Sequence, residues 1–159
     1  MTNNHISFHN NKEYLDFVRI LKGKIRNAQL KAALSVNTQL IELYWMLGSH
    51  LTSQMESCKW GAKVIDQLSI DLSTEFKELR GFSRSNLYSI YKWYNFYKEE
   101  NEIVQQLVGQ IPWGHNILIT TKIKEVKKAI WYIQRTIGNS WSRSILLHQI
   151  DLKLYERQE

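Results

Sequence analysis

The stretch from Lys24 to about Glu56 carries apolar residues at nearly unbroken three- and four-residue spacing. They are Ile25, Ala28, Ala32, Val36, Leu40, Leu43, Leu47, Leu51 and Met55. This spacing predicts one α-helix, which at 1.5 Å per residue spans about 50 Å. A small domain does not need so long a helix for its own core, so we expect part of it to cover a second chain or another domain. The alternative is a helix kinked at Gly48 with both halves packed internally.

A shorter helix is predicted before this stretch. It begins at about Asn11, and its apolar residues are Tyr14, Phe17, Val18 and Leu21. Gly23 is expected to break or kink the chain between the two helices. Residues 1–11 are rich in Asn and His and are predicted to form a flexible lead-in. We therefore predict a single domain over residues 12–155.

Few residues in this chain oppose helix formation. Pro112 is the only proline, there are seven glycines, and the alternation typical of strands is scarce. The hydrophobic content of 43% is sufficient for a core in a chain of 159 residues. The sequence therefore predicts an all-α, multi-helix domain with a long N-terminal helix.

Two helices separated by a glycine turn follow the long helix. The first is predicted from Trp60 to Phe76, with Val64, Ile65, Leu68 and Leu72 at helical spacing. The second follows Gly81, which permits a turn at positive φ, and Ser83, which is a favoured N-cap. Phe82 is expected to plug the turn into the core. Helix, short glycine turn and helix together make a helix-turn-helix.

The first turns of the second helix contact DNA in helix-turn-helix proteins. Here that segment gathers side chains that can hydrogen-bond to phosphates or base edges. The candidate DNA-binding residues are Arg80, Ser83, Arg84, Ser85, Asn86, Ser89 and Lys92. The alternative interpretation is that Ser83 only caps a buried helix and that Arg84 is an ordinary surface charge.

The second half of the chain predicts shorter elements. They are helices over residues 103–108, about 116–121 and about 126–137, a rigid turn at Pro112–His115, a turn at Gly138–Asn139, and a last helix capped by Ser142. The aromatic residues Trp93, Tyr94, Phe96 and Tyr97 could stack on the bases of a single strand. A core role is favoured for most of them, because such platforms usually lie on sheets and this chain offers none.

The charge balance suits an anionic partner such as nucleic acid. Lys and Arg number 21 against 15 Asp and Glu, which gives a net charge of +6. The densest basic run is Lys122, Lys124, Lys127 and Lys128. A single cysteine, Cys58, excludes an internal disulfide and a cysteine-based zinc cluster and fits the cytoplasm. No signal-peptide pattern and no run of 18 apolar residues is present, so we expect no contact with a membrane.

Catalytic and metal-binding sites have characteristic residue spacings. The five histidines show no ligand-like pairing, so no metal or other cofactor is expected. No glycine-rich phosphate loop, Gly-x-Ser-x-Gly elbow or His-Glu-x-x-His helix occurs. Asp66, Asp71 and Glu75-Phe76-Lys77 have the order of a metal-dependent nuclease site, but they fall on a predicted helix rather than at strand ends. We therefore expect no enzymatic activity.

Several ordered motifs between about residues 25 and 150 resemble the N-terminal domain of the YhcG-like family. They are Val36-Asn37, Leu43-Tyr44-Trp45 with Gly48, Trp60-Gly61-Ala62-Lys63-Val64-Ile65, Leu68 with Asp71-Leu72, Gly81-Phe82-Ser83-Arg84 with Asn86-Leu87, Ile111-Pro112-Trp113-Gly114-His115, and Trp141-Ser142-Arg143. The resemblance implies a helical, winged-helix-like DNA-binding module that normally precedes a PD-(D/E)XK nuclease domain. No such nuclease domain is expected within these residues. Ser85 stands where relatives often have a second basic residue, and Lys77 where many have a proline.

Two hypotheses about function follow. The first is a non-catalytic DNA-binding module that contacts DNA through the helix-turn-helix around residues 61–97. The second is a protein-interaction or dimerisation module that uses the helix over 24–56, with contacts that include Leu43, Leu47 and Leu51. The two are compatible, because helix-turn-helix proteins often bind DNA as dimers.

Overall fold

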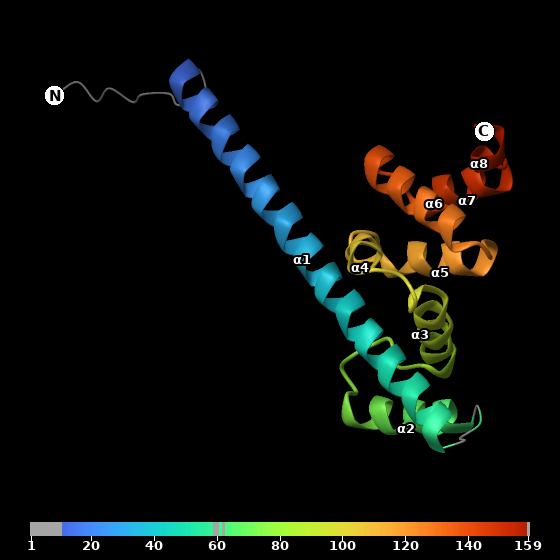
Figure 1. Cartoon of the computed structure of the whole chain (residues 1–159). Helices are drawn as coiled ribbons and strands as arrows, with labels where there is room; N and C mark the ends of the chain where they lie inside the picture. The colour runs from blue at the N-terminus through green and yellow to red at the C-terminus, as the bar shows by residue number, and fades with distance from the viewer. Residues whose placement is uncertain (1–10, 59–60, 62, 159) are drawn as a thin grey trace. The chain divides into compact units, whose positions relative to one another are not determined.

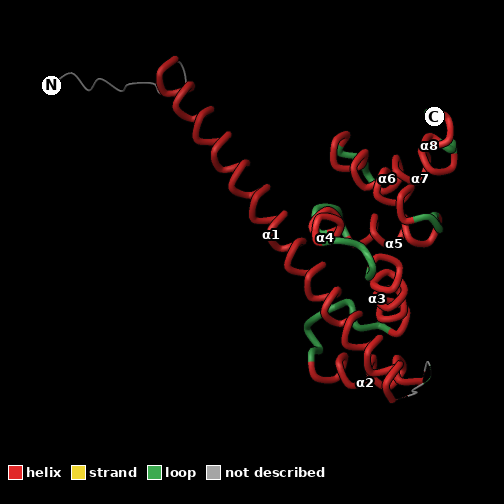
Figure 2. Tube along the Cα trace, in the orientation of Figure 1, coloured by secondary structure: helices red, strands yellow, loops and turns green. Residues whose placement is uncertain are grey.

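The computed structural model describes residues 11–58, 61 and 63–158, and this part of the chain forms eight α-helices and no strand (Figures 1 and 2). The helices are α1 Lys12–Cys58, α2 Lys63–Glu75, α3 Arg84–Tyr97, α4 Glu102–Val108, α5 Trp113–Lys122, α6 Val126–Asn139, α7 Arg143–Asp151 and α8 Leu154–Arg157. The predicted all-α fold with a long N-terminal helix is confirmed. The predicted lead-in, apart from its last residue, and the expected helix start at Trp60 lie outside the described residues.

The first helix is longer than the sequence pattern suggested. α1 continues through both Gly23 and Gly48, so the break expected at Gly23 is absent. A single glycine inside a helix costs only about 1 kcal/mol, which flanking helix formers can offset. The chain divides into two compact units, residues 1–36 and 37–159, and α1 contributes to both.

Apart from Asn11, the described part of the first unit is the α1 segment over residues 12–36. Most of its side chains are exposed, including the large apolar ones. Phe17, Leu21 and Ile25 are 56%, 40% and 57% exposed. A lone helix gains most of its stability by packing an apolar face, and these large apolar side chains remain exposed.

The second unit has a core rich in aromatic rings. Trp93 of α3 is fully buried, and its ring meets Trp45 of α1 at 5.5 Å and Trp113 of α5 at 5.0 Å, both edge to face. Tyr97 is fully buried as well, while Tyr94 and Phe96 pack partly buried against this core. The core role favoured for these aromatic residues is therefore confirmed. Edge-to-face ring pairs stabilise such a core beyond the burial of apolar area.

Residues 37–58 of α1 supply one wall of this core. Ile41, Tyr44 and Leu51 are buried there, whereas Leu43 remains 37% exposed. Leu51 was predicted to contact a second copy of the chain, and its burial removes it from any such surface. Close packing of α1 on α3 depends on Gly48, where an added Cβ would lie 2.5 Å from the Cβ of Tyr94.

The remaining helices pack in sequence around α3 and α5. α3 contacts α2 on one side and α5 on the other, and α5 contacts α6 and α7 (Figure 1). Buried Asn116 of α5 accepts a hydrogen bond from Trp93 Nε1 (3.3 Å) and donates to the carbonyl of Val108 (3.0 Å). This buried polar pair fixes the position of α5 against α3.

Two turns predicted in the second half differ from the structure. Pro112 is the N-cap of α5, which starts at Trp113 rather than near residue 116. α6 continues through the expected Gly138–Asn139 turn and ends at Asn139, and its C-cap Ser140 lies in the left-handed region at φ 51°. The predicted N-cap is confirmed at Ser142, whose hydroxyl accepts from the N–H of Ile145.

Candidate nucleic-acid interface

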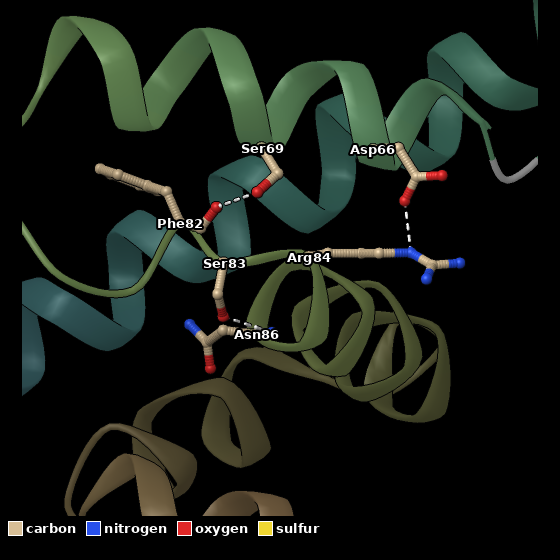
Figure 3. A network of polar contacts seen from close by, with 6 residues as sticks. All are labelled: Asp66, Ser69, Phe82, Ser83, Arg84 and Asn86. Carbon is tan, nitrogen blue, oxygen red and sulfur yellow. Dashed lines mark hydrogen bonds and ion pairs between the residues drawn. The ribbon is translucent and has the colours of Figure 1, made fainter.

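The segment between α2 and α3 is held in place by contacts with neighbouring helices (Figure 3). Gly81 has φ 112°, and an added Cβ would overlap the Tyr44 hydroxyl. Phe82 is buried, and its carbonyl accepts a hydrogen bond from the Ser69 hydroxyl of α2 at 2.7 Å. The predicted positive φ and buried aromatic plug are both confirmed. Burial raises the pKa of Tyr44, and a hydrogen bond with Asn86 acts in the opposite direction.

The connection between the two helices is longer than a helix-turn-helix normally has. It runs over residues 76–83, whereas the motif uses a turn of about three or four residues. The described residues form no strand that could serve as a wing. The structure therefore supports a helix pair joined by an ordered loop.

Two of the predicted DNA-binding residues hold the loop in place. Ser83 is the N-cap of α3, and its hydroxyl accepts from the N–H of Asn86 at 3.1 Å. The Asn86 side chain donates to the carbonyl of Gly81 (2.6 Å) and accepts from Trp113 Nε1 (2.7 Å). These side chains have structural roles, since their polar atoms are already used within the fold.

A concave surface of about 590 Å³ lies between the outward side of α3 and α5. We name it the α3–α5 groove, and it is lined by Arg84, Ser85, Tyr88, Ser89, Lys92, Ile117, Thr120, Thr121 and Lys124. Four predicted site residues, Arg84, Ser85, Ser89 and Lys92, therefore lie together in one groove. Arg80 is exposed in the loop before α3 and is not part of the lining.

The lining is basic and rich in hydroxyl groups. Arg84 and Lys92 come from α3, and Lys124 comes from the segment directly after α5. None of the described residues that line the groove is acidic. Thr120 already donates to the carbonyl of Asn116 (3.1 Å), so Ser85, Ser89 and Thr121 are the aliphatic hydroxyls available as donors to a ligand. Cations and hydroxyl donors without a carboxylate suit an anionic oxygen ligand.

Two of the cations have partners within the chain. Arg84 forms an ion pair with Asp66 of α2, yet its side chain is 72% exposed (Figure 3). An ion pair this exposed contributes about 0–1 kcal/mol, so a phosphate can compete for the guanidinium. The Lys92 ammonium lies 4.8 Å from the centroid of the Tyr88 ring, in cation–π contact.

The sequence did not predict four polar residues of this groove: Tyr88, Thr120, Thr121 and Lys124. Lys124 carried the only signal, because it belongs to the densest basic run of the chain. The two threonines carried none, since only the crossing of α5 over α3 brings them beside Arg84 and Lys92.

Metal-binding clusters and membrane-spanning helices are absent from the described residues. Nowhere in residues 11–58, 61 and 63–158 do three or more His, Cys, Asp or Glu side chains gather in a way that could hold a metal ion. Asp66, Asp71 and Glu75 lie on α2, as predicted, and not at strand ends. No helix in the described part of the chain has both the length and the apolar character needed to cross a membrane.

Comparison with protein-family models defines the family of this chain. No curated protein and no solved structure matches it. Residues 20–157 match the family model described as the DUF1016 N-terminal domain, which is the N-terminal domain of the YhcG-like family. Because this match covers almost the whole chain, the protein belongs to that family, as its motifs predicted.

Proposed function

We propose that this domain binds DNA through the α3–α5 groove. The observation that carries the proposal is the convergence of Arg84, Lys92 and Lys124 on one groove whose described lining has no carboxylate. Neutralising phosphates with Lys and Arg releases counterions, which supplies most of the affinity in nonspecific DNA binding. The net charge of +6 adds a favourable long-range field.

The arrangement of the cations suggests how a backbone would be held. Lys92 comes from α3 and Lys124 from the segment after α5, so a phosphate chain in the groove between these helices can contact both. The hydroxyls of Ser85, Ser89 and Thr121 can donate to phosphate oxygens, which fixes register without reading sequence. Arg84 can contact phosphate or a base edge after it leaves Asp66.

Fluorescence anisotropy with labelled oligonucleotides tests this proposal at several salt concentrations. Lys92→Ala and Lys124→Ala should each weaken binding and reduce the salt slope by about one. Lys127→Ala is the matched control, because Lys127 is equally cationic and exposed but does not line the groove. Equal losses from all three variants would refute the groove as the binding surface.

The proposed module is non-catalytic. Asp66, Asp71 and Glu75 lie along one helix and not at strand ends that converge on a metal ion. Asp66 is also paired with Arg84. Incubation with plasmid and Mg²⁺ should therefore leave the plasmid intact. Cleavage that requires the metal and disappears in Glu75→Gln would overturn this part of the proposal.

Self-association through residues 12–36 of α1 is a second candidate function. Val18, Ile25 and Ala32 alternate with Tyr14, Leu21 and Ala28 at the three- and four-residue spacing of a coiled-coil seam. In a parallel pair, Lys24 would face Gln29 and Lys31 would face Val36 of the second copy, so no like charges oppose one another. This spacing and the exposure of Leu21 and Ile25 support a dimer.

Sedimentation velocity over a range of concentrations tests this second candidate. The doubly substituted Leu21→Glu, Ile25→Glu chain should stay monomeric where the natural chain forms a dimer. Leu30→Glu is the matched control, because Leu30 is 68% exposed and lies off the seam. A natural chain that remains monomeric at high concentration would exclude the dimer.

A further inference from the structure

The concave shape of the α3–α5 groove bears on which form of DNA it accepts. We propose that the groove takes a single strand of DNA in preference to a duplex, with a base stacked on Tyr88. This inference rests on the proposed function of the same groove. Three features carry it: the wall that α5 forms beside α3, the size of the cavity, and the exposed aromatic ring in its lining.

The first feature is the wall beside the candidate reading helix. An α-helix with its side chains is about 10–12 Å across, and the major groove of a duplex is about 12 Å wide, so the outward face of a reading helix must protrude beyond its neighbours. Here α5 packs against α3, and Thr120, Thr121 and Lys124 line the same groove as the outward residues of α3. Two packed helices together are about 20 Å across, which exceeds the width of the major groove. The outward residues of α3 are therefore more accessible to a thinner ligand.

The second feature is the volume of the α3–α5 groove. Its volume of about 590 Å³ lies within the range of pockets that enclose small organic ligands, roughly 300–1,000 Å³. A nucleotide-sized segment fits such a space, whereas the stacked and paired bases of a duplex cannot enter it. A phosphate chain along the cavity would still meet Lys92 and Lys124.

The third feature is Tyr88, which stands in the lining with 41% of its surface exposed. Proteins that bind single strands combine a cationic groove with aromatic rings on which unpaired bases stack. Lys92 lies over one face of the Tyr88 ring, so a base stacks on the other face or displaces the ammonium, which then contacts the phosphate chain. The bases of a duplex are already stacked on one another, so only an unpaired base gains this contact.

Anisotropy titrations of the full chain test the inference. The probes are a labelled oligothymidine of about 15 nucleotides and a duplex of the same length, both at low salt. The single strand should bind at least tenfold more tightly. Tyr88→Ala and Tyr88→Leu should each lower its affinity by about 5- to 150-fold, while Tyr88→Phe keeps it, because stacking needs the ring and not the hydroxyl. Circular dichroism of each variant checks that the exposed substitution leaves the fold intact.

Each outcome separates the inference from the function on which it rests. Duplex binding as tight as single-strand binding would overturn the inference and leave the proposed function standing. Single-strand binding that is indifferent to Tyr88→Ala and Tyr88→Leu would overturn the stacking contact. Failure of both probes to bind at low salt would overturn the proposed function as well.

Discussion

Arg84 is held by Asp66 and yet remains mostly exposed, so it can exchange one anionic partner for another. Arg84→Ala removes one phosphate or base contact and should weaken DNA binding by about 1–3 kcal/mol. The free energy of unfolding should change by no more than about 0.5 kcal/mol, because exposed substitutions and exposed ion pairs contribute little. Anisotropy titration and urea denaturation measure the two quantities on the same preparation.

Phe82→Ala provides the contrasting control two residues earlier. Phe82 is 7% exposed and its ring lies 6.0 Å from that of Phe76, so its loss leaves a cavity under the loop. The free energy of unfolding should fall by about 3–5 kcal/mol. Arg84 would have a structural role instead of a binding role if Arg84→Ala destabilised the fold as much as Phe82→Ala.

Tyr97 is a fully buried residue whose hydroxyl has no hydrogen-bond partner among the described residues. Burial raises the pKa of Tyr97, so the folded protein keeps its proton at pH values where the unfolded chain has lost it. The contribution of Tyr97 to the free energy of unfolding is therefore fully retained below about pH 10. It is lost as the pH rises above this value. Tyr97→Phe should raise the free energy of unfolding by about 1 kcal/mol and flatten this alkaline loss. Urea denaturation at neutral and alkaline pH would contradict this if both values matched the natural chain.

At the scale of elements, two glycines of α1 should respond in opposite ways to the same change. Gly48→Ala places a methyl group 2.5 Å from Tyr94 Cβ and 3.3 Å from the carbonyl of Ile90, so α1 and α3 must separate. Overpacking of this kind should cost about 1–3 kcal/mol. Gly23→Ala meets nothing within 4 Å and should increase helix content, since alanine favours a helix by about 1 kcal/mol over glycine. Denaturation followed by far-UV circular dichroism measures both, and a loss of helix in Gly23→Ala would contradict the uninterrupted helix.

At the scale of the whole molecule, the two units should differ in how strongly they protect their amides from exchange. Residues 12–36 bury none of their large apolar side chains, whereas residues 37–58 of the same helix supply Ile41, Tyr44 and Leu51 to the core. Local opening of the first segment should therefore need much less free energy than opening of the second. Hydrogen exchange followed by mass spectrometry should show early exchange over 12–36 in dilute protein. Protection of residues 12–36 should rise with protein concentration if a second copy covers the seam. Uniform protection along α1 at every concentration would contradict the division of the chain into two units.

The sequence by itself determined the features that neighbours along the chain control. The caps at Ser83 and Ser142 and the positive φ at Gly81 were predictable, because a cap bonds an N–H three residues away and a left-handed turn concerns one residue. The apolar spacing of α3 was predictable for the same reason, since side chains three and four residues apart share a helix face. The scarcity of helix breakers indicated the all-α class in the same way.

Only the tertiary structure decided which of these local features form a site. Asn86 has the chemistry of a base-reading residue, but Trp113 and Gly81 lie close enough to use both ends of its side chain. Thr121 and Lys124 line the same groove as the outward side of α3 because α5 packs there, a contact between residues some thirty positions apart in the chain. Spacing along a sequence specifies which face of a helix is apolar, whereas the partner of that face depends on how all the helices share the available core.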